Sequence, residues 1–407
     1  MTFSKSLWFV RRILRQVWVR VALYCVLALA SAGIAPAVAP LLPDGLSDLM
    51  GEDPTIELLS VLTNSMLTVS TFSLSVMVAA HQFAASSATP RAHRLLREDG
   101  RTQRVLATFI GAFVFALVSR VAINAGLYGP RDFPVIYAIT ILVLLAVIVA
   151  LIRWVQQLAA LGSMEKTTGR VEQATREALE SMATRPYFGC LPIPEDEEPQ
   201  GRSVEARRFG YVRYIDFESI SEGAGPGGQI DVLVQPGDWV GPGDAVLAVL
   251  RAEVSDDELM ENIVIGDLRS YDQDPVFGFQ VLSEIAQRAL SPGLNDPQTA
   301  VDVIYRQSRL LHLWNGKPVD DPLPGVRVRA GSAERAMHVA LDHISRDGAA
   351  MVEVHMALQK VLARMDHHSD PYMQLAARRV SARALERSDR ALLLKSDREA
   401  VRAAAPS

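Results

Sequence analysis

The densest group of polar side chains that could do chemistry lies between residues 269 and 306. Its first part contains Arg269, Gln273 and Asp274, and Asp274 stands directly before a proline. This arrangement is typical of a helix start, because the carboxylate accepts hydrogen bonds from free N–H groups and the proline loses none. Capping is therefore one interpretation of Asp274. The alternative is a charged ligand site to which Arg269 and Gln273 contribute.

A second polar cluster occupies the turn before a helix predicted over 297–314. It contains Ser291, Asn295, Asp296 and Thr299, and Asp296 again precedes a proline. Capping is again one interpretation. The other is a ligand site, because the helix N-terminus directs partial positive charge toward whatever the neighbouring side chains bind. The residues that would complete such a polar pocket are Arg269, Glu284, Arg288 and Asp302.

Nucleophilic and metal chemistry receive little support from residue spacing. Ser291 lacks a nucleophile-elbow pattern, and the nearest candidate bases, His312 and His338, have no spacing that places them beside it. The histidines show no H-E-x-x-H pattern, and Cys25 and Cys190 have no neighbours at metal-ligand spacing. We therefore predict no catalytic residue, no metal ion and no cofactor.

A stripe of polar residues runs through the apolar segment 56–80. Asn64, Thr68, Thr71 and Ser75 are spaced by four, three and four residues, which places them on one side of a helix. Polar side chains are costly in lipid, so the stripe should face other helices or a water-filled path. Helix packing and a pore both remain open as interpretations.

Arg120 is a charged residue inside another apolar segment, 105–127. A charge at the bilayer centre costs about 2.5 to 3.5 kcal/mol on insertion scales. Arg120 lies toward one end of its segment, where a long side chain can extend to the interface. We leave two roles open: an interfacial anchor, or the buried partner of a polar residue or an anion.

Four apolar segments supply the elements that position these membrane residues. Each is close to the roughly 20 residues that a helix needs to cross the hydrocarbon core. A cleaved signal peptide is the alternative for the first segment, but its basic leader is long and further apolar segments follow. The predicted spans are residues 21–42, 56–80, 105–127 and 134–152, within an α-helical integral membrane domain over 1–160.

The distribution of basic residues predicts the orientation of these spans, because Lys and Arg are retained on the cytoplasmic side. Five basic residues precede the first span. The loop over 44–57 has five acidic residues and no basic one, whereas the loop over 91–104 has five arginines. We therefore predict a multi-pass protein with both termini in the cytoplasm.

The rest of the chain predicts an α+β cytoplasmic domain. Residues 161–203 form a connecting helix and an acidic linker, 204–255 a small β-rich module, and 256–407 a helical domain that includes 269–306. Apolar periodicity predicts its helices over 276–290, 297–314, 333–347, about 350–365 and 371–402.

The segment VQPGDWVGPGDAVLAVL resembles the turn-and-strand pattern of barrel-sandwich modules that carry biotin or lipoate. The covalent function does not transfer, because those modules need a lysine and this chain has none between Lys166 and Lys317. We interpret the module as structural, with Gly237 and Gly243 supplying turn conformations that other residues find strained.

Composition narrows the class of partner. The 407 residues are 49% apolar and 21% charged, with a net charge of -5, so no global field attracts a polyanion. We expect no nucleic-acid partner. The expected partners are the lipid bilayer and further copies of the chain, with an ion or a small-molecule ligand as another candidate.

The motifs also resemble an uncharacterised family of bacterial predicted inner-membrane proteins, a domain of unknown function. Its signature is Gln-Asp-Pro followed by Ser-Pro-Gly-x-Asn-Asp-Pro-x-Thr-Ala, with a Ser-Pro-Arg element after the second span. Thr89 stands where the family commonly has that serine, before Pro90 and Arg91. The resemblance implies a bacterial inner-membrane protein and no established chemistry. The matching residues are Gln273, Asp274, Pro275, Ser291, Pro292, Gly293, Asn295, Asp296, Pro297, Thr299 and Ala300.

Together these features favour an oligomeric channel or transport-like protein that is gated by its cytoplasmic domain. A membrane-anchored scaffold or sensor is the main alternative, in which the spans only anchor and the cytoplasmic domain binds a partner or small ligand. A membrane hydrolase centred on residues 291–299 is a third hypothesis.

The orientation can be tested with reporter fusions. Fusions after Arg97 and after Trp154 should both report the cytoplasm, because arginine-rich flanks stay on that side. A fusion near Asp48 should report the outer side. A cytoplasmic signal from the Asp48 fusion would contradict the four-span topology.

Overall fold

A computed structural model describes the chain in two compact units. The membrane-helix unit comprises residues 1–87 and 93–164, and the α/β unit comprises 88–92 and 165–407. The described residues are 17–38, 50–87, 89–92, 100–158, 164–194, 197–314, 320–329 and 331–406.

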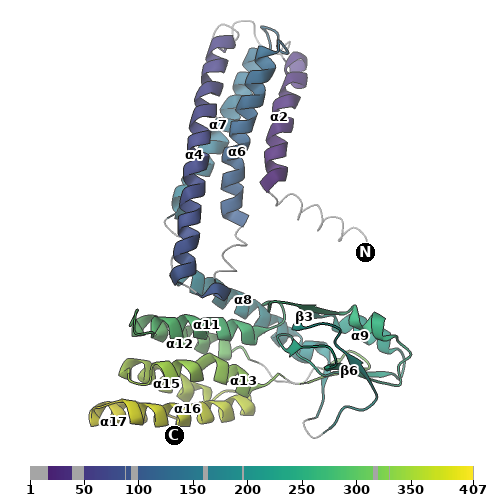
Figure 1. Ribbon diagram of the computed structural model, residues 1–407, viewed down its shortest axis with the longest axis vertical. Coiled ribbons are helices and arrows are strands. Elements are labelled where there is room, and N and C mark those ends of the chain that lie inside the picture. The colour runs from purple at the N-terminus through teal and green to yellow at the C-terminus, as the bar shows by residue number, and fades with distance from the viewer. Residues whose placement is uncertain are drawn as a thin grey trace. The chain divides into compact units, whose positions relative to one another are not determined.

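The described part of the membrane-helix unit contains four long helices (Figure 1). Three of them hold an apolar run long enough to cross a membrane: Glu52–Ala79, Val105–Asn124 and Phe133–Gln156. In the remaining helix, the described apolar run, Val21–Ser31, is shorter. Three of the four predicted spans are thus supported. The first predicted span, 21–42, stays a prediction, and its last residues, 39–42, lie outside the described part. The helices are α2 (Val17–Val38), α4 (Glu52–Ser87), α6 (Gly100–Asn124) and α7 (Phe133–Leu158).

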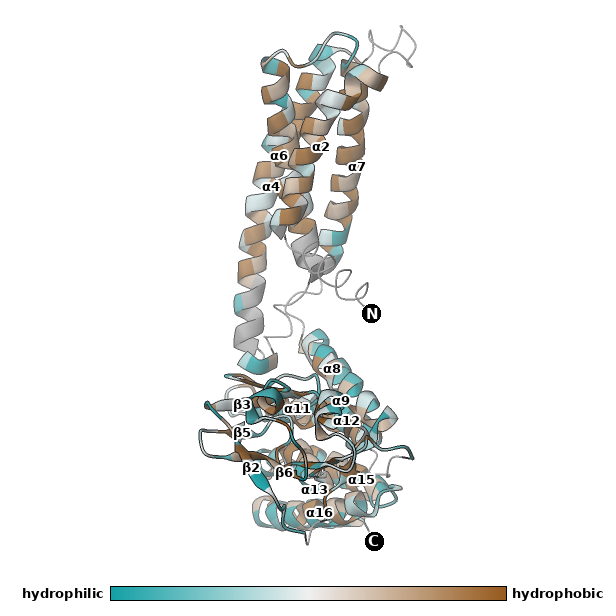
Figure 2. Cartoon of the chain, turned by 90° about the vertical axis from the view of Figure 1, so that its right-hand side faces the viewer, coloured by the Kyte–Doolittle hydropathy of each residue, from teal (hydrophilic) through white to brown (hydrophobic). Residues whose placement is uncertain are grey.

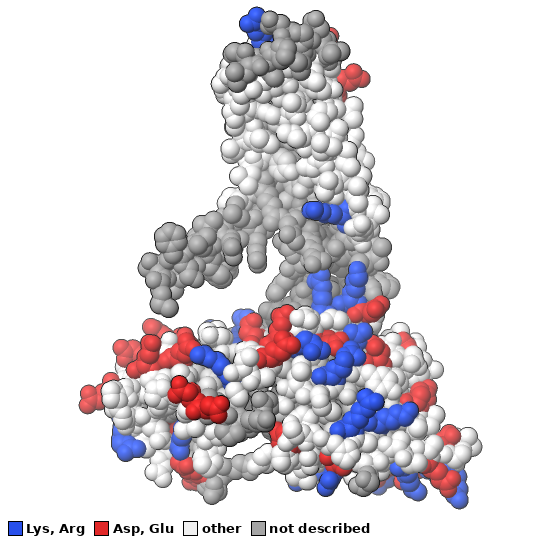
Figure 3. Space-filling model, turned by 180° about the vertical axis from the view of Figure 1, so that it is seen from behind, with Lys and Arg blue, Asp and Glu red and all other residues white. Residues whose placement is uncertain are grey.

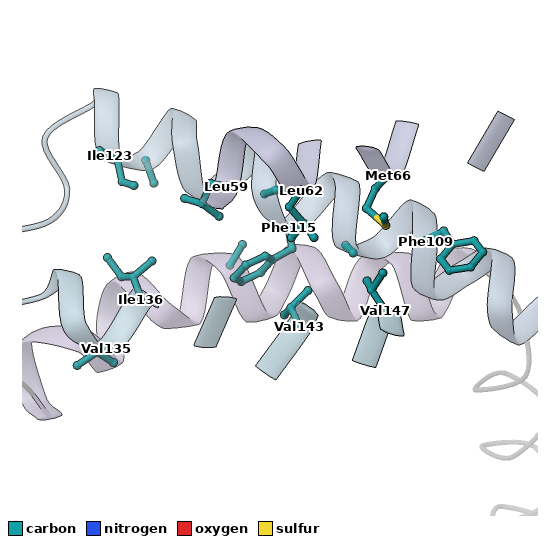
Figure 4. Close-up of a cluster of buried hydrophobic side chains, with 14 of the residues drawn as sticks. Leu59, Leu62, Met66, Phe109, Phe115, Ile123, Val135, Ile136, Val143 and Val147 are labelled. Carbon is teal, nitrogen blue, oxygen red and sulfur yellow. The ribbon is translucent and has the colours of Figure 1, made fainter. Parts of the chain in front are cut away.

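An apolar core holds these helices together (Figure 4). Phe109 and Phe115 of α6 are fully buried among side chains of α4 and α7. The first helix joins this core through Tyr24, whose ring lies against Gly111 so closely that a Cβ there would come within 2.2 Å of it. Although its apolar run is short, α2 is therefore a packed member of the bundle.

The two units differ in surface character. Apolar residues dominate the helices of the membrane-helix unit, whereas polar residues alternate with apolar ones throughout the α/β unit (Figure 2). Charged side chains are sparse on the visible face of the first unit and frequent on that of the second (Figure 3). An apolar outer surface is what lipid contact requires.

The α/β unit contains two small sheets in its described part, in the orders β1-β8-β4-β6-β2 and β5-β3-β7. The predicted β-rich module contains β3 to β6 and the second half of β2, but β1, β7 and β8 lie outside 204–255. The parallel pairing of β4 with β8 brings residues 230–232 beside 326–328. The strands are β1 (Leu191–Pro192), β2 (Arg202–Glu205), β3 (Gly210–Ile215), β4 (Gln229–Val232), β5 (Trp239–Val240), β6 (Ala245–Leu250), β7 (Ile263–Gly266) and β8 (Val326–Val328).

The helices predicted after residue 275 are present with one correction, and two short helices over residues 217–224 and 256–260 were not predicted. The helix predicted over 371–402 is interrupted, because Leu392 and Leu394 adopt extended backbone conformations and Leu392 is buried. A π-helical turn (η3, His338–Asp342) also lies between α13 and α14. The helices are α8 (Met164–Thr184), α9 (Phe217–Ala224), α10 (Asp256–Met260), α11 (Pro275–Ala289), α12 (Pro297–Leu311), α13 (Ala333–Met337), α14 (His343–Asp347), α15 (Val352–Met365), α16 (Pro371–Ala391) and α17 (Lys395–Ala403).

Candidate functional site

The Gln-Asp-Pro element joins the β-rich part of the α/β unit to its helices. The side chain of Gln273 pairs with the backbone of Ile215 at the end of β3. Its Oε1 accepts a hydrogen bond from the Ile215 N–H at 2.9 Å, and its Nε2 donates to the Ile215 carbonyl at 3.0 Å. Gln273 thus satisfies the backbone of a strand end, as a neighbouring strand would.

Asp274 caps the helix that follows and forms a buried ion pair. Its Oδ1 accepts from the Phe277 N–H at 2.9 Å. Arg269 donates Nη2 to Oδ1 at 2.9 Å and Nε to Oδ2 at 2.8 Å, which is the bidentate geometry favoured by guanidinium and carboxylate. Burial raises the pKa of Asp274 above its ordinary value, and the charge of Arg269 opposes that rise.

This ion pair explains one of the predicted turn glycines. Gly237 has a φ of +93°, and a Cβ there would meet Asp274 Oδ2 at 2.1 Å and Arg269 Nη2 at 2.8 Å. Gly243 also adopts a positive φ, but nothing lies within 4 Å of its hypothetical Cβ. Of these two glycines, Gly237 is the one at which both the backbone conformation and the close approach require glycine.

A chain of hydrogen bonds, here called the polar relay, runs from Asp274 to residue 91. Arg269 donates Nη1 to Gln280 Oε1 at 2.7 Å, and Gln280 donates Nε2 to Glu284 Oε1 at 3.0 Å. The same Glu284 oxygen accepts from Arg91 Nη1 at 2.5 Å. The polar relay therefore links the Gln-Asp-Pro element with the chain segment that follows α4.

That segment, residues 89–92, belongs to the α/β unit. Thr89 and Ala92 are buried, and the Ala92 N–H donates to Thr89 Oγ1 at 3.3 Å. A serine could accept the same bond, so the threonine preserves the capping function of the hydroxyl. Arg91, which reaches Glu284, lies within the turn that this hydrogen bond closes.

The chain segment that follows α7 is held by the same pair of motif helices. Glu172 of α8 accepts from Arg306 Nη1 at 2.8 Å and from Arg309 Nη2 at 2.9 Å, both on α12. Gly278 of α11 packs on Thr175 of α8, since a Cβ at Gly278 would lie 1.9 Å from the threonine hydroxyl. Both described segments that continue from membrane helices therefore contact α11 or α12.

The second motif forms the turn between α11 and α12, and its hydrogen bonds are local. Ser291 Oγ donates to the Arg288 carbonyl at 2.7 Å, and Asn295 adopts a left-handed φ of 47°. Asp296 Oδ1 accepts from the Thr299 N–H at 3.1 Å, and Oδ2 accepts from its hydroxyl at 2.5 Å. These hydrogen bonds lower the pKa of Asp296. Every recorded contact of Asp296 is that of a helix cap.

The side chains expected to complete a polar pocket do not converge on one site, because they bond to different partners. Gln280 joins Arg269 and Glu284 within the polar relay, whereas Asp302 pairs with Arg306 at 2.6 Å. Ser291 Oγ bonds to the backbone carbonyl of Arg288, whereas the hydrogen bonds of Asp296 within the described residues go to Thr299 and not to Arg269, Glu284 or Asp302. The two motifs thus form two separate structures.

The polar stripe of α4 lies on the face that points away from its own bundle. Asn64, Thr68, Thr71 and Ser75 are all exposed on the single chain. At about 100° per residue, this face is opposite the buried face of the helix. The stripe therefore does not pack against α2, α6 or α7. The buried face comprises Leu59, Leu62, Met66, Ser70 and Ser73.

Arg120 is half-buried on α6. Its Nη1 lies 3.5 Å from Ser60 Oγ of α4, which gives it a polar neighbour on another helix. Both roles, an interfacial anchor and the partner of a polar residue or an anion, stay predictions.

The histidine-rich turn after α15 is occupied by capping contacts. His368 Nδ1 accepts from the Asp370 N–H at 3.0 Å, and Asp370 caps α16 by accepting from the Tyr372 N–H at 2.8 Å. Among the described residues, no group of three or more His, Cys, Asp or Glu could hold a metal ion.

The sequence indicated Glu284 as a candidate for the polar pocket but not Gln280, which joins Glu284 to Arg269 in the polar relay. Gln280 and Glu284 are spaced four apart on α11, which signals contact along one helix face. Their contact with residue 91 has no such signal, because 193 positions separate the two residues. The Pro-Arg pair after the second span was the only indication of Arg91.

Comparison with known proteins identifies relatives without an assigned function. Residues 15–364 match a family described as predicted membrane protein (DUF2254). Uncharacterized protein MT1328 of Mycobacterium tuberculosis (strain CDC 1551) is 26% identical over 369 residues, covering 85% of this chain and 70% of the relative. Uncharacterized protein Mb1321c of Mycobacterium bovis and uncharacterized protein Rv1290c of M. tuberculosis (strain H37Rv) match with the same identity and coverage. No solved structure gives a significant match.

The cap geometry of Asp296 predicts the outcome of two substitutions. Asp296→Ala should lower the free energy of unfolding by about 0.5 to 2 kcal/mol, because the N–H of Thr299 loses its acceptor. Asp296→Asn should retain most of the stability, since an amide oxygen can accept the same bond. Thermal unfolding of the detergent-solubilised chain measures both effects.

Asp302→Ala is the matched control, because it removes an exposed carboxylate from the same helix without removing a cap. An exposed i,i+4 pair contributes about 0.3 to 0.5 kcal/mol, so this control should change stability less than Asp296→Ala. Unchanged stability of Asp296→Ala would contradict the capping role. A stable Asp296→Asn variant that loses ligand binding or conductance would instead assign the turn to a ligand site.

Proposed function

The chain belongs to the DUF2254 family of predicted membrane proteins, and we propose that it is a homo-oligomer whose α/β unit regulates a polar path along α4. The observation that carries the proposal is the position of the polar stripe, opposite the buried face of α4. The exposed amide of Asn64 is costly to leave unpaired in lipid, whereas the hydroxyls of Thr68, Thr71 and Ser75 bond to carbonyl oxygens of their own helix. A second copy of the chain, with water between the copies, would give the stripe a polar environment. An ion or a small polar solute is the proposed cargo.

The proposed location is the bacterial inner membrane, with both termini in the cytoplasm. Support comes from the five arginines of the 91–104 loop and the acidic loop over 44–57. Asp44, Asp48, Arg94 and Arg97 lie outside the described residues. In this orientation the α/β unit is cytoplasmic and can respond to the cell interior.

The proposed regulation acts through the two segments that continue from membrane helices. Arg91 follows α4, the helix with the polar stripe, and pairs with Glu284. Glu172, on the helix after α7, pairs with Arg306 and Arg309. A rearrangement of the α11–α12 pair would therefore act on both segments. Allostery requires such a shared element whose state both sites influence.

A membrane-anchored sensor is the second candidate function. It is favoured by a cavity of about 390 Å³ within the α/β unit, which lies in the size range of small-molecule sites. In this alternative the spans only anchor the sensor, and the polar stripe forms a contact between subunits.

Cysteine labelling distinguishes the polar path from lipid exposure. Cysteines introduced at Thr68, Thr71 and Ser75 should react with small water-soluble thiol reagents, because a polar path admits water. Cysteines at Leu67 and Leu74, on the flank of the stripe, should react slowly. Both native cysteines, Cys25 and Cys190, are replaced beforehand. Equal inertness at all five positions would contradict the path and favour the sensor.

The same assay tests regulation by the polar relay. In the Ser75→Cys chain, Glu284→Arg should repel Arg91, release the segment after α4 and raise the labelling rate. A coupling free energy at the low end of measured values corresponds to about fivefold. Adding Arg91→Glu restores opposite charges and should restore the original rate.

Glu386→Arg is the matched control for this reversal. Glu386 pairs with an arginine on the exposed surface of α16 and takes no part in the polar relay. Its reversal should leave labelling at residue 75 unchanged. If Glu284→Arg and Glu386→Arg had the same effect, the Arg91–Glu284 contact would not regulate the path.

A further inference from the structure

The cavity in the α/β unit has walls suited to a flat ring. Its volume is about 390 Å³, and four aromatic side chains line it: Tyr187, Phe188, Trp314 and Tyr372. They come from three separate parts of the chain: the turn after α8, the end of α12 and the start of α16. Aromatic faces pack best against other planar groups, in stacked or edge-to-face arrangements.

Two of these rings are presented by an unusual backbone. Tyr187 and Phe188 have left-handed φ values of 52° and 58°, which non-glycine residues adopt at an energetic cost. Phe188 stacks on Phe217 at a centroid distance of 4.7 Å, and this contact fixes its position. Burial is the main cause of the raised pKa of Tyr187, followed by the charge of Asp370, so its hydroxyl stays a hydrogen-bond donor.

The charged groups of the cavity wall leave one cation available. Two of the carboxylates cap helices: Asp274 is also paired with Arg269, and Asp370 accepts from the Tyr372 N–H. Glu334 pairs with Arg379 at 2.9 Å. Arg329 is exposed, and its guanidinium has no recorded ion pair or hydrogen bond with the described residues. Arg329 is therefore the cation of the described wall with which a bound anion can still pair.

We propose that this cavity binds a small planar aromatic or heteroaromatic molecule that carries one anionic group, with its ring among Tyr187, Phe188, Trp314 and Tyr372 and its anion on Arg329. The arginine fork suits a carboxylate or a phosphate, because it donates two parallel hydrogen bonds.

Binding at this cavity also offers an input to the polar relay, because Asp274 both lines the cavity and begins the relay. Only this effect on the membrane helices rests on the proposed function. The binding itself depends on the cavity, its rings and the guanidinium of Arg329, which has no partner among the described residues.

Indole-3-acetate is a suitable probe, because it combines one planar ring system with one carboxylate. Saturation-transfer difference NMR on the full detergent-solubilised chain should show contact with its ring protons and give a dissociation constant by titration. Indole-3-acetamide lacks the charge and cyclohexylacetate lacks the aromatic ring, so both should bind at least about tenfold more weakly, as expected for the loss of one charge-assisted or stacking contact.

Variants separate cavity binding from adsorption to detergent. Arg329→Gln and Tyr372→Ala should each weaken indole-3-acetate binding about tenfold, the effect of losing one such contact. Both residues are exposed, so these changes should leave the thermal unfolding midpoint unchanged. Arg390→Gln, at the far end of α16, is the matched control and should bind like the parent chain.

Three results would overturn the proposal: absence of saturation transfer, equal binding of the three compounds, or equal binding of the Arg329 and Arg390 variants. The labelling assay at residue 75 keeps the two proposals distinct. Probe binding without a change in labelling would refute control of the path by this cavity and retain the ligand site. Failure of binding, with the Glu284 effect intact, would refute the ligand site and retain the regulation.

Discussion

The buried pair of Asp274 and Arg269 is the interaction on which the α/β unit depends. Burying a carboxylate costs several kcal/mol unless opposite charge and hydrogen bonds replace its water. Here a bidentate guanidinium and a helix N-terminus do so, and Gly237 leaves the space that the pair fills. The turn before β5, the loop before α11 and α11 itself must therefore meet at one point. Removing one ion would leave the other buried without a partner.

This joint gives the α11–α12 pair a role beyond packing. From Arg269, the polar relay follows α11 to Arg91, while α12 holds Glu172 through two arginines. The motif helices consequently contact both described segments that continue from membrane helices. Residues that identify the family can have a structural role without being catalytic. Gln273 and Asp274 set where α11 starts. The position of that start determines which residue Glu284 reaches.

Local patterns in the sequence predict much of the fold. Long apolar runs predict the three supported spans, and an aspartate before a proline predicts the starts of α11, α12 and α16. The features that the sequence did not predict depend on contacts between segments that lie far apart in the chain. A strand of three residues, β8, shows no period, and its partner β4 lies almost a hundred residues earlier. The cavity and the Arg91–Glu284 contact likewise form only when distant segments pack, so neither leaves a spacing to detect.

The residues of the polar stripe of α4 differ in how well they tolerate lipid. Thr68, Thr71 and Ser75 donate their hydroxyl hydrogens to carbonyl oxygens of their own helix, so each hydroxyl is satisfied even in lipid. Asn64 differs, because its amide has no recorded hydrogen bond with the described residues and is exposed. Hydroxyls of this kind tolerate lipid, whereas an unpaired amide requires water or a partner chain. Asn64 is therefore the residue of the stripe that most strongly requires a polar path or a subunit contact.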